Sequence, residues 1–186
     1  MKRIAFDIDG CLADLISPML QILEIEHKKI VKYEDITDFN LEKSFQLDSK
    51  QIHQIIDEAI QNYENLFPYP GVVEFLVEYQ KEHKNILIIT QRKIENDYFT
   101  RRWFEKFFPL IDMERIQIAY SYNKMIPLKF YRIDQMVEDR AEVAISLANQ
   151  GIKVFLMDRP WNQFDDSNEN ITRVKNWEDI KNYGKE

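Results

Sequence analysis

The chain has 186 residues, a formal net charge of −7 and a pI near 5.1. That length suits one domain, or one core with a modest insertion. The acidic balance argues against a nucleic acid polymer as partner, because proteins that bind polyanions usually carry a basic patch or stripe. A small phosphorylated molecule stays compatible with this charge, because a few lysines and one divalent cation can create a local positive pocket.

The chain contains a single cysteine, Cys11, so no intrachain disulfide can form and no cysteine cluster is available for zinc. Its N-terminus runs directly into a predicted strand, and no apolar run approaches the roughly 18 residues of a membrane span. We therefore expect a soluble, cytoplasmic protein in a reducing compartment, with no membrane partner.

The first predicted element is a strand, Ile4–Phe6, that runs into two aspartates and a glycine. Because residues i and i+2 of a strand share a face, Asp7 and Asp9 are predicted to start on one side of its carboxyl end, where open α/β sheets place ligands. Paired carboxylates can divide the work of phosphoryl transfer, one as nucleophile and metal ligand, the other as proton donor and acceptor. The alternative for this fragment alone is an ordinary Asp-Gly turn.

Residues 15–70 contain no strand-like run, and helical patterns dominate there, notably over Leu15–His27 and Ser49–Leu66. The turn Pro68–Gly71 leads back out of this region. An insertion directly after the first strand would lie over the carboxyl edge of the sheet. We expect a helical cap that can close on a substrate and exclude water.

Beyond this region, short apolar runs alternate with helical patterns. The further predicted strands are Ile86–Ile89, Ile116–Ala119, Gln135–Val137 and Val154–Met157. The predicted helices are Val72–His83, Tyr98–Phe107 and Ala141–Gln150. Such alternation is typical of βαβ units, so the sequence predicts an α/β fold with a parallel sheet flanked by helices.

Polar residues follow two of these strands. Thr90 and Gln91 end the second strand, where a hydroxyl and backbone amides could hold a phosphate oxygen; a plain polar loop is the alternative. Glu138 and Asp139 end the fourth strand. If the first and fourth strands are neighbours, these acids meet the first aspartate pair and supply the hard oxygen ligands that Mg²⁺ prefers.

Lys124 lies between these strand ends and precedes a predicted helix. Its point charge could neutralise both a nucleophilic carboxylate and a phosphate. Taken alone, the same lysine could be an ordinary solvated surface residue.

The series of Asp-x-Asp, strand-end threonine, lysine and paired acids resembles the haloacid dehalogenase (HAD) superfamily of aspartate-nucleophile phosphatases. Within it, the chain is similar to the 5′(3′)-deoxyribonucleotidase family and its bacterial nucleotidases. The segments that carry this resemblance are Asp7–Asp14, Tyr33–Thr37, Pro68–Gly71, Val137–Asp139 and Asp158–Asn162. The resemblance spans most of the chain and implies a Rossmann-like core of residues 1–14 and 71–186 with a C1-type helical cap of residues 15–70.

The resemblance also implies roles for the site residues. Asp7 is then the nucleophile and a Mg²⁺ ligand, and it forms an aspartyl-phosphate that water hydrolyses. Asp9 is the general acid and then the base, and its backbone carbonyl and the Asp139 side chain complete the protein's Mg²⁺ ligands. Glu138 lies beside them as a second-sphere residue. The groups that hold the phosphoryl oxygens are Thr90, Gln91 and Lys124.

Three positions need comment against this family pattern. Cys11 stands where relatives often have Thr or Val, and we expect it to pack as a small hydrophobe. Lys129 is the alternative to Lys124, whose position 14 residues before Glu138 fits the bacterial pattern better. Trp161 is expected to pack, although its loop follows the fifth strand and could approach the site.

The sequence determines the substrate least well. Five aromatic residues of the insertion could stack a nucleobase or pack the insertion on the core: Tyr33, Phe39, Phe45, Tyr63 and Phe67. The resemblance favours a (deoxy)nucleoside monophosphate as substrate, and a sugar phosphate or another small phosphate ester is the alternative. A non-catalytic binder of phosphate ligands is disfavoured, because binding alone requires no proton donor such as Asp9. The sequence is compatible with a homodimer and does not determine the oligomeric state.

Overall fold

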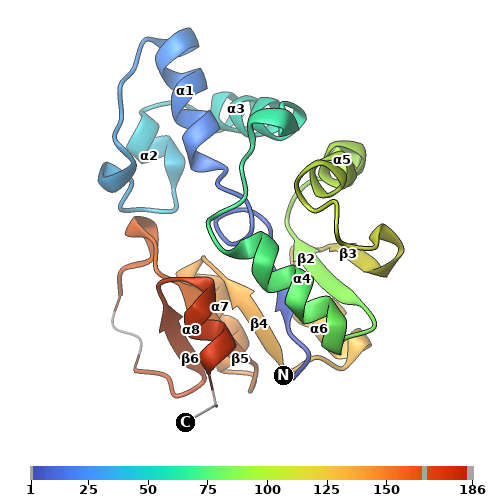
Figure 1. Ribbon diagram of the computed structural model, residues 1–186. Helices are drawn as coiled ribbons and strands as arrows, with labels where there is room; N and C mark the ends of the chain where they lie inside the picture. The colour runs from blue at the N-terminus through green and yellow to red at the C-terminus, as the bar shows by residue number, and fades with distance from the viewer. Residues whose placement is uncertain (1, 165–166, 184–186) are drawn as a thin grey trace.

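The computed structural model describes residues 2–164 and 167–183, and in them the predicted α/β fold is confirmed. A parallel sheet has the strand order β3-β2-β1-β4-β5-β6 (Figure 1). Its strands are β1 (Ala5–Phe6), β2 (Ile86–Thr90), β3 (Ile116–Tyr120), β4 (Gln135–Glu138), β5 (Lys153–Met157) and β6 (Ile171–Val174). Because β1 pairs with both β2 and β4, the strand ends that carry the polar motifs are neighbours.

Helices cover both faces of this sheet. They are α4 (Val72–Glu82), α5 (Asp97–Phe107), α6 (Met125–Tyr131), α7 (Ala141–Ala148) and α8 (Trp177–Asn182). One face packs against α4, α5 and α8 through a cluster that includes Phe6, Ile88 and Trp103. The other face packs against α6 and α7, with Leu87 and Met136 among its residues. Alternate strand residues thus enter opposite cores, as burial on both faces of a parallel sheet requires.

The strand β6 was not predicted from the sequence. Its end residues Ile171 and Val174 are buried, but Thr172 and Arg173 between them are partly exposed. Because β6 is an edge strand that pairs only with β5 among the described residues, it lacks the continuous apolar run that marks the inner strands.

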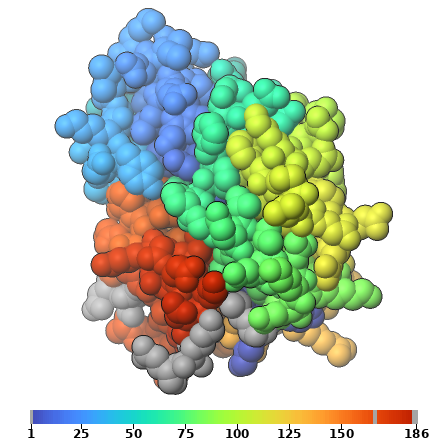
Figure 2. Space-filling view, viewed as in Figure 1, coloured from blue at the N-terminus to red at the C-terminus, as the bar shows by residue number. Residues whose placement is uncertain are grey.

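Residues 15–70, all of which are described, form a helical segment with no strand. It consists of α1 (Ile16–His27), the short α2 (Leu41–Phe45) and α3 (Ser49–Gln61), with one 3₁₀ turn between α1 and α2 and another after α3. Helix α1 matches its predicted pattern, α3 ends at Gln61 and not at Leu66 as predicted, and α2 was not predicted. The apolar cluster of this segment is centred on Met19, Phe45 and Ile55, and Trp161 from the loop after β5 also belongs to it. It lies above the carboxyl edge of the sheet (Figure 1), and its blue and cyan atoms sit on the rest of the molecule in Figure 2.

Candidate active site

Three carboxylates and one ammonium lie buried together at the ends of β1 and β4. Asp7 follows β1, Glu138 ends β4 and Asp139 follows it. The Lys124 Nζ lies 2.8 Å from Asp7 Oδ2 and 2.7 Å from Glu138 Oε2. The other oxygen of Glu138 accepts the backbone N–H groups of Asp139 and Arg140. Glu138 therefore fixes both the lysine and the turn that carries Asp139.

The charges of this cluster do not balance, and the pKa values reflect this. Burial raises the pKa of Asp7 to about 7, with Lys124 opposing the shift and Glu138 adding to it. Burial also raises the pKa of Asp139 well above its usual value, and the carboxylates of Glu138 and Asp7 raise it further. Burial alone would lower the pKa of Lys124, but Asp7 and Glu138 hold it above its usual range. A cation placed here would offset the excess negative charge.

The donor atoms of the cluster fit a metal ion. A carboxylate oxygen from each of Asp7 and Asp139 and the sulfur of Cys11 all lie within 4.8 Å of one another. Two buried carboxylates are hard oxygen donors of the kind that suit Mg²⁺. Cys11 is fully buried, as expected of a packing residue, and its sulfur also borders this donor set.

The loop after β1 approaches Asp139 closely at Gly10. A Cβ built on Gly10 would lie only 2.0 Å from Asp139 Oδ2, and the backbone φ there is +77°. Both the conformation and the contact exclude other residues at this position. The glycine of the Asp-x-Asp-Gly motif thus allows the loop to pass directly over the Asp139 carboxylate.

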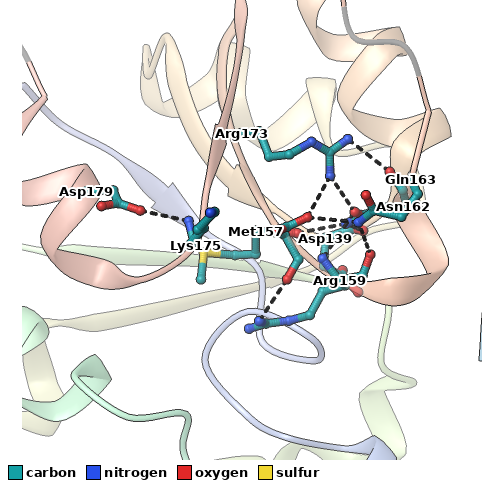
Figure 3. Close-up of polar contacts among 9 residues, drawn as sticks. Asp139, Met157, Arg159, Asn162, Gln163, Arg173, Lys175 and Asp179 are labelled. Carbon is teal, nitrogen blue, oxygen red and sulfur yellow. Dashed lines mark hydrogen bonds and ion pairs between the residues drawn. The ribbon is translucent and has the colours of Figure 1, made fainter. Parts of the chain in front are cut away.

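A loop after β5 orients Asp139 from the other side (Figure 3). The Trp161 Nε1 donates to Asp139 Oδ2 at 2.9 Å. The side-chain amide of Asn162 donates to the backbone carbonyls of Asp139 and Met157, at 2.6 and 2.7 Å. Arg173 on β6 in turn donates to Asn162 Oδ1 at 2.8 Å. Trp161 is therefore more than the packing residue that the sequence suggested, because its indole N–H holds a site carboxylate.

Asp9 pairs with a different cation from Asp7. The Arg92 guanidinium binds it in a bidentate manner, with Nε 2.8 Å from Oδ2 and Nη2 2.6 Å from Oδ1. No role was predicted for Arg92, which follows β2 in what the sequence indicates is a polar loop. Its only signal is its place two residues after the strand-end Thr90, because the pairing with Asp9 spans 83 residues of sequence.

The other predicted site residues occupy different places. Thr90 is buried at the end of β2, and its hydroxyl oxygen accepts the Arg92 N–H at 3.1 Å. The Gln91 side chain is already engaged, accepting from Arg140 at 2.7 Å and donating to the carbonyl of Tyr122 at 3.3 Å. Lys129 is exposed near the end of α6, so the structure brings Lys124, and not Lys129, to Asp7.

A cavity of about 350 Å³ separates this charged floor from the helical segment. Its floor includes Asp7, Asp9 and Asp139. Its roof comes from α1, α3, the start of α2 and the loop before α2, and it is mainly apolar with some polar residues: Asn40, Glu42, Ser49, His53 and Asp57. The roof residues include Ile16, Met19, Phe39, Ile52, Ile56 and Ile60.

Hydrogen bonds also join the roof of the cavity to the loop after β2. Asp57 on α3 accepts from Lys93 at 2.6 Å and from Asn96 Nδ2 at 3.1 Å, in the loop after β2.

The five candidate aromatic residues lie in different environments. Phe39 lines the cavity, and the guanidinium of Arg140 lies 4.0 Å from its ring centre. Phe45 is fully buried in the helical segment, and Phe67 packs on Phe107. Tyr33 contacts the Trp161 ring, and Tyr63 lies near Phe99, both outside the cavity lining. Of the five, only Phe39 faces the space above the floor.

The fold identifies the structural class of the protein. A HAD-superfamily hydrolase from Geobacter sulfurreducens, 15% identical, superposes with a TM-score of 0.60 over 98% of this chain and 95% of its own. At that identity the likeness shows the fold alone, and the fold is that of HAD-type hydrolases.

Sequence comparison then identifies the family. The family model described as "5′ nucleotidase, deoxy (Pyrimidine), cytosolic type C protein" matches residues 1–184, so the chain belongs to that family. A candidate nucleotidase of Halalkalibacterium halodurans is 29% identical over 97% of this chain and 91% of its own length. A 5′(3′)-deoxyribonucleotidase of Bacillus subtilis is 25% identical over 97% and 96%. The protein is a phosphoric monoester hydrolase, as the resemblance predicted.

None of the helices within residues 2–164 and 167–183 has the length and hydrophobicity that a crossing of the bilayer demands.

Proposed function

We propose that the protein is a Mg²⁺-dependent phosphatase of nucleoside monophosphates that works through an aspartyl-phosphate on Asp7. The observation that carries this proposal is the buried group of Asp7, Asp139 and Glu138 with the single ammonium of Lys124, from which Asp7 and Asp139 line the floor of a cavity. A nucleophilic carboxylate, a cation beside it and a separate carboxylate at Asp9 are the parts that phosphoryl transfer through a covalent intermediate requires.

The reaction takes two steps. In the first, the Asp7 carboxylate attacks the phosphorus, the bond from phosphorus to the ester oxygen breaks, and that oxygen takes a proton from Asp9. In the second, water attacks the phosphorus of the aspartyl-phosphate and gives its proton to Asp9, which frees phosphate and Asp7. The net reaction converts a phosphate ester and water into an alcohol and phosphate.

The charged groups around Asp7 support this chemistry. Lys124 is positioned to offset charge on the phosphoryl oxygens, and Glu138 holds its ammonium in place. The Thr90 hydroxyl accepts from Arg92 and so keeps its own proton free to donate to a phosphoryl oxygen. Mg²⁺ would be held by Asp7, Asp139 and the backbone carbonyl of Asp9, and when bound it would neutralise charge on the transferred group.

The roof supports a substrate with a flat, partly apolar group. Phe39 lines the cavity and is 37% exposed, and a base can stack on the part of its ring that the Arg140 guanidinium leaves uncovered. Apolar side chains of α1 and α3 line much of the remaining space, beside polar residues that include Glu42, Ser49 and His53. The hydroxyl groups of a sugar phosphate would lack hydrogen-bond partners where they meet these apolar side chains. A nucleobase instead presents apolar faces to them.

We further propose that residues 15–70 act as a lid over the core of residues 1–14 and 71–186. The apolar cluster of the helical segment supports this division, because Trp161 is its one buried member from the rest of the described chain. Hydrogen exchange of residues 15–67, with and without Mg²⁺ and beryllium fluoride as a phosphate analogue, tests it. Greater protection in the presence of both supports a closing lid, and equal protection contradicts it.

The test of the activity is phosphate release from deoxy- and ribonucleoside monophosphates and sugar phosphates, with Mg²⁺ or EDTA. We expect release from nucleotides first, only with the metal, and its loss in Asp9→Asn. A preference for sugar phosphates over every nucleotide would refute the substrate class while keeping the chemistry. No release from any ester would refute the enzyme proposal itself.

A further inference from the structure

Arg92 is a buried cation of the cavity lining that the two-step reaction above does not use. Its side chain is only 1% exposed, whereas that of its partner Asp9 is 24% exposed. Both residues line the cavity. The two parallel bonds of the pair, 2.8 and 2.6 Å long, fix the plane of the Asp9 carboxylate as well as its position.

The guanidinium is itself fixed by the core of the protein. Its third nitrogen, Nη1, donates to Thr100 Oγ1 at 3.1 Å, and Thr100 is fully buried on α5. The backbone N–H of Arg92 donates to Thr90 at the end of β2. The helix α5 packs on the sheet through Trp103 and Phe104. Arg92 therefore connects the Asp9 carboxylate, on the loop after β1, to the packed elements α5 and β2.

An exposed ion pair would carry no such meaning, because most surface pairs contribute little and hold no fixed geometry. This pair differs because the arginine is buried and satisfied on three sides, while the carboxylate faces the space where an ester would bind. Proton transfer depends on placing the donor within hydrogen-bond reach of the reacting oxygen, and small misplacements are costly.

We propose that Arg92 is a positioning residue, which orients Asp9 for proton transfer to the departing ester oxygen. This inference rests on the proposed function, in which Asp9 is the proton-transfer group. Arg92 does not contact the reacting atoms in this scheme; it acts only through Asp9.

The inference predicts a dependence on the leaving group. The alkoxide of a nucleoside is a poor leaving group and needs a proton as its bond to phosphorus breaks, whereas p-nitrophenolate leaves without one. Loss of Arg92 should therefore slow the cleavage of nucleotides and barely affect p-nitrophenyl phosphate. A merely structural role of Arg92 would lower the rate with both esters alike.

The experiment compares kcat/KM of the wild type and Arg92→Met for a deoxynucleoside 5′-monophosphate and for p-nitrophenyl phosphate, with Mg²⁺. The ratio kcat/KM is suited because it reports the steps up to departure of the first product, before the phosphoenzyme is hydrolysed. We expect a loss of about 10- to 100-fold with the nucleotide, part of the roughly 10²- to 10⁴-fold that a proton-transfer group contributes. The loss with p-nitrophenyl phosphate should be under about threefold.

Further variants separate geometry from charge and from folding. Arg92→Lys keeps the charge but cannot form two parallel bonds, so it should not restore nucleotide cleavage. Thr100→Val removes the third anchor of Arg92, together with the side-chain hydrogen bond between Thr100 and Tyr120, and should show the same selective loss in a weaker form, even where Arg92→Met fails to fold. Arg101→Met, at an exposed arginine of α5 that pairs with Asp97, is the matched control and should change neither ester.

Equal losses with both esters, or full rescue by Arg92→Lys, would overturn the inference. Absence of phosphate release by the wild type from either ester would instead overturn the proposed function, and the inference with it.

Discussion

The floor and the roof of the cavity are built in different ways. Each charged side chain of the floor has named partners: Asp7 and Glu138 hold Lys124, Trp161 holds Asp139, and Arg92 holds Asp9. The roof is mainly apolar, and several of its side chains belong to an apolar cluster of residues 15–70 that Trp161 of the core joins.

This difference indicates a division of labour. Transition-state stabilisation needs charges held rigidly in place, because a preorganised site need not reorganise during the reaction. Recognition of an apolar group needs only a wall of suitable shape. We therefore expect changes in the floor to affect turnover and changes in the roof to affect KM and substrate choice.

The largest expected effect comes from Asp7→Asn. Removing the nucleophile should lower kcat by about five to six orders of magnitude, comparable to the loss of one member of a catalytic triad. Turnover is measured by phosphate release with Mg²⁺, and circular dichroism checks that the variant folds. If a folded variant kept more than a hundredth of wild-type turnover, Asp7 would not be the nucleophile.

The next largest effect should follow Gly10→Ala. The added methyl would overlap Asp139 Oδ2, so the loop or the carboxylate must move, and we expect kcat to fall by at least about 100-fold. Gly151→Ala is the matched control, because Gly151 has a similar φ of +82° with nothing within 4 Å of the new Cβ. It should lose about 1 kcal/mol of stability and no activity. Equal activity losses in the two variants would show that backbone strain, and not the contact with Asp139, is responsible.

A roof substitution should have a smaller and different effect. Phe39→Ala should raise KM for a nucleotide by about tenfold, since stacking of a base contributes about 1–3 kcal/mol. It should leave KM for a small substrate without a base, such as the acyl phosphate acetyl phosphate, nearly unchanged. Phe67→Ala, at an exposed ring that packs on Phe107 away from the cavity lining, is the control. A fall in kcat with unchanged KM in Phe39→Ala would contradict the division between floor and roof.

The smallest expected effect concerns stability in EDTA. The folded pKa of Asp7, about 7, lies above the unfolded value of 3.8, so its contribution to stability is fully present below 3.8 and is lost as the pH rises to 7. At pH 8 the metal-free Asp7→Asn variant should thus melt above the wild type, by about 2–4 °C for each kcal/mol of repulsion removed. The difference should shrink towards pH 5. Thermal melts at both pH values measure it, and a wild type that melts higher at pH 8 would show that Lys124 outweighs the burial cost.

The sequence predicted the floor better than the roof, for a physical reason. Parallel strands bring their carboxyl ends to one edge, so motifs that follow β1, β2 and β4 can be placed together without knowing any side-chain contact. Five of the six described strands follow from their apolar runs, and only the half-exposed edge strand β6 was missed. The joint burial of Asp7, Lys124 and Asp139 follows this topology.

The partners of these residues could not be predicted in the same way. Arg92 reaches Asp9, and Trp161 reaches Asp139, across 83 and 22 residues of sequence. Neither local periodicity nor a motif encodes which way such a side chain turns. The sequence also did not distinguish Phe39 from Phe45 and Tyr33, which are aromatic residues of the same segment. Of these three residues, Phe39 lines the cavity.

The central claim, that the floor forms a covalent intermediate on Asp7, is tested most directly by chemical trapping. Borohydride added during steady-state turnover of a deoxynucleoside monophosphate with Mg²⁺ reduces an aspartyl-phosphate to homoserine, which peptide mass spectrometry locates. We predict homoserine at position 7, only when substrate and metal are both present. Turnover that proceeds without any reduced aspartate at position 7, or with the reduced residue at Asp9 or Asp139, would contradict this account.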